Sequence, residues 1–198
     1  RSCEVEGLDE RCMLVGGVPQ WAGCITPLVL SFDASPVIME PSPAASFDIM
    51  DAGGCVSTDW PTAATPWLAL DRDGDGLVET GAELFGSGTR MPDGRHAGDG
   101  FEALSELDTD GDGKITRADE RFDELVLWSD VDRDKRGTAL ELEPLSARGI
   151  LSIELDYRST PRCDARGNCE IERARFRFID GVGSVGRGEV VDVHLACQ

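Results

Sequence analysis

The chain has 198 residues and a formal net charge of −19 at pH 7, and it is long enough for one well-buried domain. Its acidic balance argues against nucleic acid and anionic lipid surfaces as partners, since both require cationic protein surface. No apolar run approaches the roughly 18 residues needed to cross a bilayer, so we expect no membrane-spanning segment and a single compact domain over 1–198.

Cysteines lie on both sides of an acidic central region. The seven positions are Cys3, Cys12, Cys24, Cys55, Cys163, Cys169 and Cys197. We interpret them as disulfide-forming, with one left free or intermolecular, which implies an oxidising compartment: secreted, periplasmic or cell-surface. Zinc is the rival interpretation, but there is no Cys-x-x-Cys pair and no histidine within a cysteine cluster. The start at Arg1, without a methionine, is read as the mature form of an exported protein.

Residues 1–64 are expected to form a disulfide-bearing β segment. Cys3 and Cys12 are close enough in sequence to close a local loop. The apolar runs 27–32 and 36–39, separated by a short polar turn, predict a hairpin.

Three acidic loops of one spacing fill the region 71–141. They read Asp71-Arg-Asp-Gly-Asp-Gly, Asp108-Thr-Asp-Gly-Asp-Gly and Asp130-Val-Asp-Arg-Asp-Lys. Carboxylates at positions 1, 3 and 5 of a curled loop converge on one point, and a glycine at position 6 allows the following turn. Such carboxylates repel one another unless a cation lies between them. The loops therefore predict calcium, two to three ions, while solvated acidic turns without metal are the alternative.

The candidate ligands differ between the loops. Loop one offers Asp71, Asp73, Asp75, the carbonyl of Leu77, Glu79 and Glu83; loop two offers Asp108, Asp110, Asp112, the carbonyl of Lys114, Thr116 and Asp119; loop three offers Asp130, Asp132, Asp134, the carbonyl of Arg136 and Glu141. In loop one, Glu83 stands one place later than the usual glutamate, and Gly81 is expected to give the backbone slack for that shift. In loop two the shorter Asp119 predicts weaker binding. In loop three Lys135 replaces the turn glycine, which costs about 1 kcal/mol.

Short helices are expected around the loops, over 67–70, 101–107, 118–127 and 140–148. Asp99, with Glu102 three residues later, is a candidate cap for the second helix, and Gly149 is placed to end the last one. Loops one and two are separated by 37 residues, a spacing near that of paired EF-hands. Loops two and three are expected to share the helix 118–127, so that filling one favours the other.

The last segment, 149–198, alternates apolar and polar residues over 151–157, 170–179 and 191–195, which predicts an antiparallel meander. The turn 163–169 is short enough for a disulfide to close. A row of Arg173, Arg175 and Arg177 is read as a solvated sheet face, with an acidic-partner site as the alternative.

The predicted fold is therefore α+β: a central EF-hand-like helical calcium-binding region, 65–148, between N- and C-terminal antiparallel β segments held by disulfides. The motifs Trp67-Leu-Ala-Leu-Asp-Arg-Asp-Gly-Asp-Gly76, Ala82-Glu-Leu-Phe-Gly86 and Leu127-Trp-Ser-Asp130 resemble the EF-hand-type calcium-binding domain of exported and haemolysin-associated (RTX-type) proteins of Gram-negative bacteria. This resemblance covers about 26–178. It implies calcium binding and export, and because the family's glutamate also comes one place late, it implies Glu83 as a ligand.

No serine or cysteine has a histidine at a recognisable motif spacing, so no catalytic residue is assigned and no enzyme is predicted. We expect calcium to be mainly structural in an extracellular or cell-surface interaction module, whose partner is a surface protein or a polysaccharide. An accessory domain of a secreted enzyme or toxin, and a calcium-responsive switch, are the alternatives.

Overall fold

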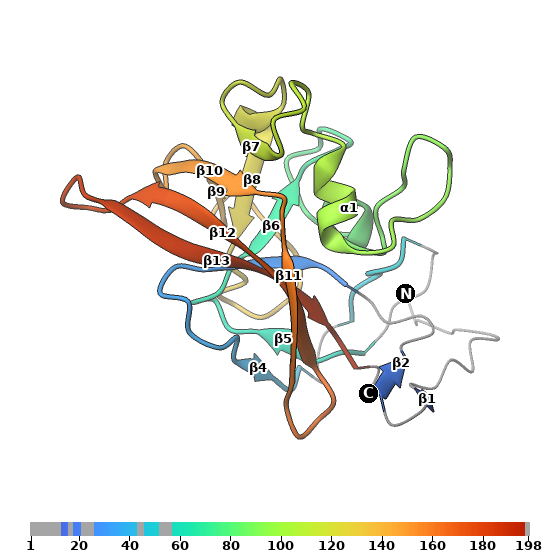
Figure 1. Cartoon of the computed structure of the whole chain (residues 1–198). Helices are drawn as coiled ribbons and strands as arrows, with labels where there is room; N and C mark the ends of the chain where they lie inside the picture. Colours follow the sequence, from blue (N-terminus) through green and yellow to red (C-terminus); the bar gives the residue numbers. More distant parts are fainter. Residues whose placement is uncertain (1–12, 16–17, 21–25, 43–45, 52–56, 197–198) are drawn as a thin grey trace.

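The computed structural model describes residues 13–15, 18–20, 26–42, 46–51 and 57–196, and antiparallel strands dominate this part of the chain (Figure 1). One sheet has nine strands in the order β7-β10-β12-β13-β3-β6-β8-β9, with β11 paired to β12 beside β10. Its strands are β3 (Leu28–Ser31), β6 (Trp67–Leu70), β7 (Lys114–Thr116), β8 (Leu125–Trp128), β9 (Leu142–Pro144), β10 (Ile150–Glu154), β11 (Arg158–Cys163), β12 (Cys169–Ile179) and β13 (Val185–His194).

The remaining described elements are short. β1 (Met13–Val15) pairs with β2 (Val18–Gln20), and β4 (Met39–Glu40) pairs with β5 (Trp60–Pro61). There is one α-helix among the described residues, α1 (Gly100–Ser105), together with 3-10 turns at Gly81–Glu83 and Phe122–Glu124. None of these helices is long and apolar enough to cross a membrane.

Both faces of the central strands are buried. On β3, Leu28 and Leu30 join one apolar core, which also contains Phe101 of α1, whereas Val29 points into a second core. β6 and β8 divide their side chains in the same way, and Trp67 and Trp128 enter the second core. Because both faces of these strands pack against apolar cores, nearly every residue along each strand is hydrophobic.

The predicted α+β fold with a helical central region is wrong. The segment 67–70 is strand β6, 118–127 holds the 3-10 turn and strand β8, and 140–148 holds β9 and turns. The physical reason is pairing: β6 and β8 lie side by side over four residue pairs, from Trp67 opposite Trp128 to Leu70 opposite Leu125. Side chains buried on two sides fit a central strand, and a one-sided helix would leave half of them in water.

The helix predicted over 101–107 is the one that forms, as α1. The Asp99 side chain accepts a hydrogen bond of 2.7 Å from the Glu102 backbone N–H, which satisfies one of the free donors of the first turn. The helix ends early, at Ser105, because Leu107 and Asp108 already turn into loop two.

The C-terminal strands form the predicted antiparallel arrangement. β10 pairs with β12, and β12 pairs with β13 along most of its length. The hairpin predicted from 27–32 and 36–39 is wrong, because β3 pairs with β13 and β6 while β4 pairs with β5. The nine-stranded sheet thus takes strands from all three predicted sub-regions, 1–64, 65–148 and 149–198; the domain extent over 1–198 stays a prediction.

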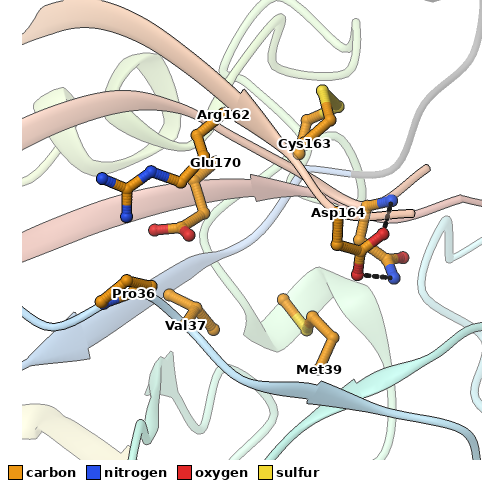
Figure 2. A pocket seen from close by; sticks show the side chains of 9 residues that line it. Pro36, Val37, Met39, Arg162, Cys163, Asp164 and Glu170 are labelled. Carbon is orange, nitrogen blue, oxygen red and sulfur yellow. Dashed lines mark hydrogen bonds between the residues drawn. A yellow bond between two sulfur atoms is a disulfide. The ribbon is translucent and has the colours of Figure 1, made fainter. Parts of the chain in front are cut away.

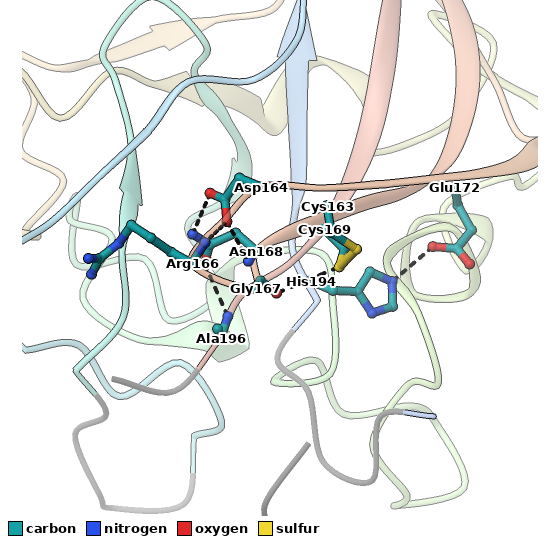
Figure 3. The surroundings of a disulfide bond; sticks show 9 residues. All are labelled: Cys163, Asp164, Arg166, Gly167, Asn168, Cys169, Glu172, His194 and Ala196. Atoms are coloured by element: carbon teal, nitrogen blue, oxygen red, sulfur yellow. Dashed lines mark hydrogen bonds and ion pairs between the residues drawn. A yellow bond between two sulfur atoms is a disulfide. The ribbon is translucent and has the colours of Figure 1, made fainter. Parts of the chain in front are cut away.

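The predicted disulfide between Cys163 and Cys169 is confirmed, and it closes the turn between β11 and β12 (Figure 3). Inside that turn Asn168 donates hydrogen bonds to Asp164 and to the buried Asp59, which also pairs with Arg166. The other five cysteines, and with them the predicted Cys3–Cys12 loop, lie outside the described residues.

Replacing both Cys163 and Cys169 by serine is expected to lower the free energy of unfolding by about 2 kcal/mol, the loop-closure value for so short a turn. Urea denaturation of the full chain measures it. An unchanged unfolding midpoint would contradict the expectation that this bond stabilises the fold.

Candidate metal centres

Loop one follows strand β6 directly, so the buried Leu70 fixes the start of an exposed loop. Asp71 accepts hydrogen bonds from the backbone N–H groups of Gly74 (2.7 Å) and Gly76 (2.9 Å), which curl the loop around its carboxylate. Both glycines have positive φ angles, 78° and 83°, which favour glycine. The result is a cluster: single carboxylate oxygens of Asp71, Asp73, Asp75 and Glu83 lie within 4.8 Å of one another.

Glu83 completes this cluster from the 3-10 turn. Its carboxylate accepts hydrogen bonds from the backbone N–H groups of Glu79 (2.8 Å) and Thr80 (3.2 Å), and the residue is buried. Burial raises the pKa of Glu83, and the nearby Asp73 and Asp71 raise it further. A cation between the carboxylates would remove that repulsion.

Position 81 requires glycine because of a close backbone contact, and not because of the predicted backbone slack. A Cβ at this position would lie 1.7 Å from the carbonyl oxygen of Ile49. The Gly81 N–H donates a 2.8 Å hydrogen bond to the carbonyl oxygen of Asp48. The close backbone approach, rather than extra flexibility, therefore holds the turn that carries Glu83.

Loop two follows α1 and brings together Asp108, Asp110 and Asp119. Asp119 is buried and accepts hydrogen bonds from the N–H groups of Thr109 (2.8 Å) and Thr116 (2.7 Å). Within the loop, Ile115 of β7 pairs with Ile153 of β10, which anchors the loop to the sheet.

Loop three follows β8 and brings together Asp130, Asp132, Asp134 and Glu141. Asp130 is buried, and its Oδ1 has no hydrogen-bond partner within the described part of the chain. Burial raises the pKa of Asp130, and Glu141 and Asp134 also raise it. A buried carboxylate oxygen without a donor is costly, and either a proton or a bound cation would relieve that cost.

The left-handed turn of loop three is made without glycine. Arg133 and Lys135 have φ angles of 66° and 59° at the positions where the other loops have glycine. The Lys135 side chain is buried; its Nζ donates to the carbonyl oxygen of Thr58 (3.1 Å) and lies 4.8 Å from the centre of the Trp60 ring. Burial lowers the pKa of Lys135 to about 8. These contacts give Lys135 a packing role that the loop pattern alone does not reveal.

Two of the predicted carboxylate ligands, Glu79 and Asp112, are not among the clustered carboxylates. Glu79 pairs with Arg136 of loop three at 2.6 Å, and the Asp112 carboxylate accepts the Lys114 N–H at 2.9 Å. The Thr116 hydroxyl accepts the Ala118 N–H. The residues whose carbonyls are candidate ligands, Leu77, Lys114 and Arg136, each donate their N–H to the aspartate at position 5, so the three loops share one backbone path.

Loops one and three are neighbours in space. Val78 and Gly137 exchange two backbone hydrogen bonds, of 2.9 and 2.8 Å, each at the eighth position of its loop. Gly137 permits this approach, since a Cβ there would lie 2.8 Å from the Val78 Cβ. The predicted helix 118–127 between loops two and three is absent, and the direct contact joins loops one and three instead.

A small pocket of about 180 Å³ lies between the segment 36–39 and the β11–β12 turn (Figure 2). Its acids are engaged: Asp164 accepts hydrogen bonds from Asn168, and Glu170 pairs with Arg173. The volume is below the roughly 300–1,000 Å³ of ordinary ligand pockets.

One further cluster has no counterpart in the sequence prediction. Glu172, Asp192 and His194 bring ligand atoms within 4.8 Å of one another on β12 and β13. The only sequence signal is the spacing of Asp192 and His194, which places both on one face of a strand.

The fold and these clusters define an antiparallel β-sheet domain whose connecting loops gather carboxylates. The chain belongs to the SPM domain family, which matches residues 28–196. It is 36% identical over 137 residues to iron-regulated protein FrpA of Neisseria meningitidis serogroup C. The match spans 69% of this chain and 12% of that relative's length.

The resemblance to an EF-hand-type domain of RTX-type exported proteins is therefore wrong. The family that matches is the SPM domain, and the elements around loops one and three are strands and 3-10 turns where an EF-hand has helices. The name of the relative refers to iron regulation, not to calcium. What the sequence pattern detected is the local loop, whose spacing is independent of the elements at its ends.

Proposed function

We propose that the chain is an exported module that binds calcium at its three acidic loops and needs the ions to complete its fold. The observation that carries this proposal is the convergence of Asp71, Asp73, Asp75 and Glu83, in which a buried glutamate from a separate turn meets three loop aspartates. All-oxygen, multi-carboxylate sites suit Ca²⁺.

The three sites are unequal. Loops one and three each gather four carboxylates, while loop two gathers three. Loop two, with fewer charged ligands, should bind most weakly, and waters would fill its remaining positions. The Val78–Gly137 contact ties the two fuller sites together, so they should fill over a similar range of calcium concentration.

Calorimetric titration of the calcium-free chain with Ca²⁺ tests the proposal. Glu83→Gln should remove the heat of loop one, and Asp130→Asn that of loop three, because each takes a buried charge from one cluster. Glu106→Gln and Asp123→Asn change exposed acids outside the clusters and serve as matched controls that should leave the titration unchanged. Absence of calcium heat in the unaltered chain would refute the proposal.

Export and an interaction role are part of the same proposal. The Cys163–Cys169 disulfide supports an oxidising compartment. A structural role for calcium suits such a compartment, because extracellular modules bind it with dissociation constants near 10⁻⁴–10⁻³ M. The partner would be a surface protein or a polysaccharide.

A further inference from the structure

The cluster of Glu172, Asp192 and His194 lies away from the three loops, on the long β12–β13 pair. Asp192 and His194 are two residues apart on β13 and so share a face. The register between β12 and β13 shifts between Glu170 and Arg173, which is a β-bulge. Bulges re-aim side chains, and this one brings Glu172 within 4.8 Å of the other two ligand atoms.

Asp192 is fully buried, with 0% of its surface exposed. Its Oδ2 accepts a 2.5 Å hydrogen bond from the Gly100 N–H, while Oδ1 finds no partner among the described residues. Burial raises the pKa of Asp192 well above its usual value, and Glu172 and Asp99 add to the rise. A fully buried carboxylate with one unpartnered oxygen is costly, and either a proton or a bound cation would relieve that cost.

His194 presents two ring nitrogens to this environment. Nε2 lies 2.9 Å from the Glu172 carboxylate, and Nδ1 is buried with no partner in the described part of the chain. Figure 3 shows the imidazole beside the Cys163–Cys169 disulfide, facing Glu172. The side chains of His194 and Glu172 remain 12% and 16% exposed, which leaves a route for an ion from solvent.

Negative charge collects around this point. Tyr157 stacks on Phe101, and its hydroxyl lies 3.4 Å from Asp99. Asp99 is the largest cause of the raised pKa of Tyr157, and burial, Glu172 and Asp192 raise it further. The carboxylates of the cluster therefore act on a neighbouring side chain as well as on one another.

One imidazole and two carboxylates make a different ligand set from the loops. Ca²⁺ takes oxygen ligands, whereas Zn²⁺ and similar ions accept histidine nitrogen together with Asp or Glu oxygen. Three protein ligands leave a coordination position open for water or a further ligand. The simpler alternative is a His194–Glu172 ion pair beside a protonated Asp192.

We propose that Glu172, Asp192 and His194 form a site for a divalent transition-metal ion of the zinc class, separate from the calcium loops. The ion would join β12 to β13 and, through the Gly100 contact of Asp192, would steady the start of α1. This inference does not depend on calcium binding at the loops.

Equilibrium dialysis of the full chain against Zn²⁺, followed by metal analysis, tests the site. Calcium is kept saturating so that the loops do not take up zinc, and free thiols are alkylated beforehand because thiolates bind zinc. We expect one zinc ion per chain, lost in His194→Gln and Asp192→Asn. His96→Gln, at the other histidine, is the matched control and should retain it.

A second variant, Glu172→Gln, is needed in case Asp192→Asn prevents folding. Glu172 is partly exposed, and glutamine has the same shape as glutamate, so this variant should fold. It should bind zinc at least tenfold more weakly, and its far-ultraviolet circular dichroism spectrum should match that of the unaltered chain, which shows that the fold is intact. Cobalt as a probe should give visible absorption bands that vanish in His194→Gln. Zinc absent from the calcium-saturated chain, or retained in both His194→Gln and Glu172→Gln, would overturn the proposal, whatever the loops do.

Discussion

Chelating calcium from the full chain is expected to lower its melting temperature by about 20 °C. At free calcium a hundredfold above its dissociation constant, each filled loop adds about 2.7 kcal/mol to the free energy of unfolding. Three loops therefore add about 8 kcal/mol, and a domain of this size shifts by about 2–4 °C per kcal/mol. Differential scanning calorimetry in excess calcium and in excess chelator measures the shift.

The pH dependence of that shift follows from Glu83 and Asp130. Burial raises the pKa of both carboxyls in the folded chain. An acid whose pKa is higher in the folded than in the unfolded state destabilises the fold when ionised, and this loss is relieved as the pH falls through the folded pKa. The chelator effect should therefore be smaller at mildly acidic pH than at neutral pH.

Asp130→Asn tests whether the effect of chelation comes from the loops, and Asp123→Asn is its control. It removes one charge from loop three and should reduce the calcium-dependent part of the melting temperature, while Asp123→Asn should not. Equal melting temperatures with and without chelator would show that the loops fold without ions.

Gly81→Ala is expected to cost about 3 kcal/mol in the free energy of unfolding, near the upper end for an inserted methyl group. The new Cβ would lie 1.7 Å from the Ile49 carbonyl oxygen, and the three nearest atoms all belong to the Ile49 backbone, so no flexible side chain can move aside. The turn that carries Glu83 must shift, so loop one should also lose calcium affinity. Urea denaturation and calcium titration measure the two effects.

Gly181→Ala is the matched control for that substitution. A Cβ on Gly181 would meet open space, and the φ angle of this residue is not positive, so alanine there should leave both measurements close to those of the unaltered chain. A Gly81→Ala protein with unchanged stability and an unchanged loop-one titration would mean that Ile49 moves away freely.

The loops were predictable from sequence because their information is local. Alternating aspartates and a glycine specify a backbone path over a few residues, and the same hydrogen bonds recur in the structure from Gly76 to Asp71 and from Gly113 to Asp108. Even the late Glu83 lies where the spacing suggested. Calcium occupancy itself stays a prediction.

The secondary structure around the loops was not predictable, because contacts between segments far apart in the sequence decide it. Runs such as Leu125-Val-Leu-Trp128 are apolar at every position, and such a run satisfies a helical period as well as a strand period. Only the pairing of β8 with β6 and β9, and the two cores on either side, decide for a strand. The contact between Val78 and Gly137 is hidden for the same reason, since 59 residues separate them along the chain.

The Glu172–Asp192–His194 cluster shows a third kind of limit. Asp192 and His194 looked like the polar face of a half-buried strand, which alternation alone would turn toward water. Helix α1 covers that face, with Gly100 hydrogen-bonded to Asp192, and the bulge in β12 adds Glu172. Neither the covering helix nor the bulge produces a periodic pattern in the sequence.

The strand order from β7 to β9 begins and ends at an acidic loop. β7 lies within loop two, β9 follows loop three, and each has only three residues. Short outer strands protect a sheet from pairing with other molecules. Because β7 covers β10, loosening loop two would uncover the backbone of a longer inner strand. Loss of calcium should therefore increase self-association through sheet edges before the core itself unfolds.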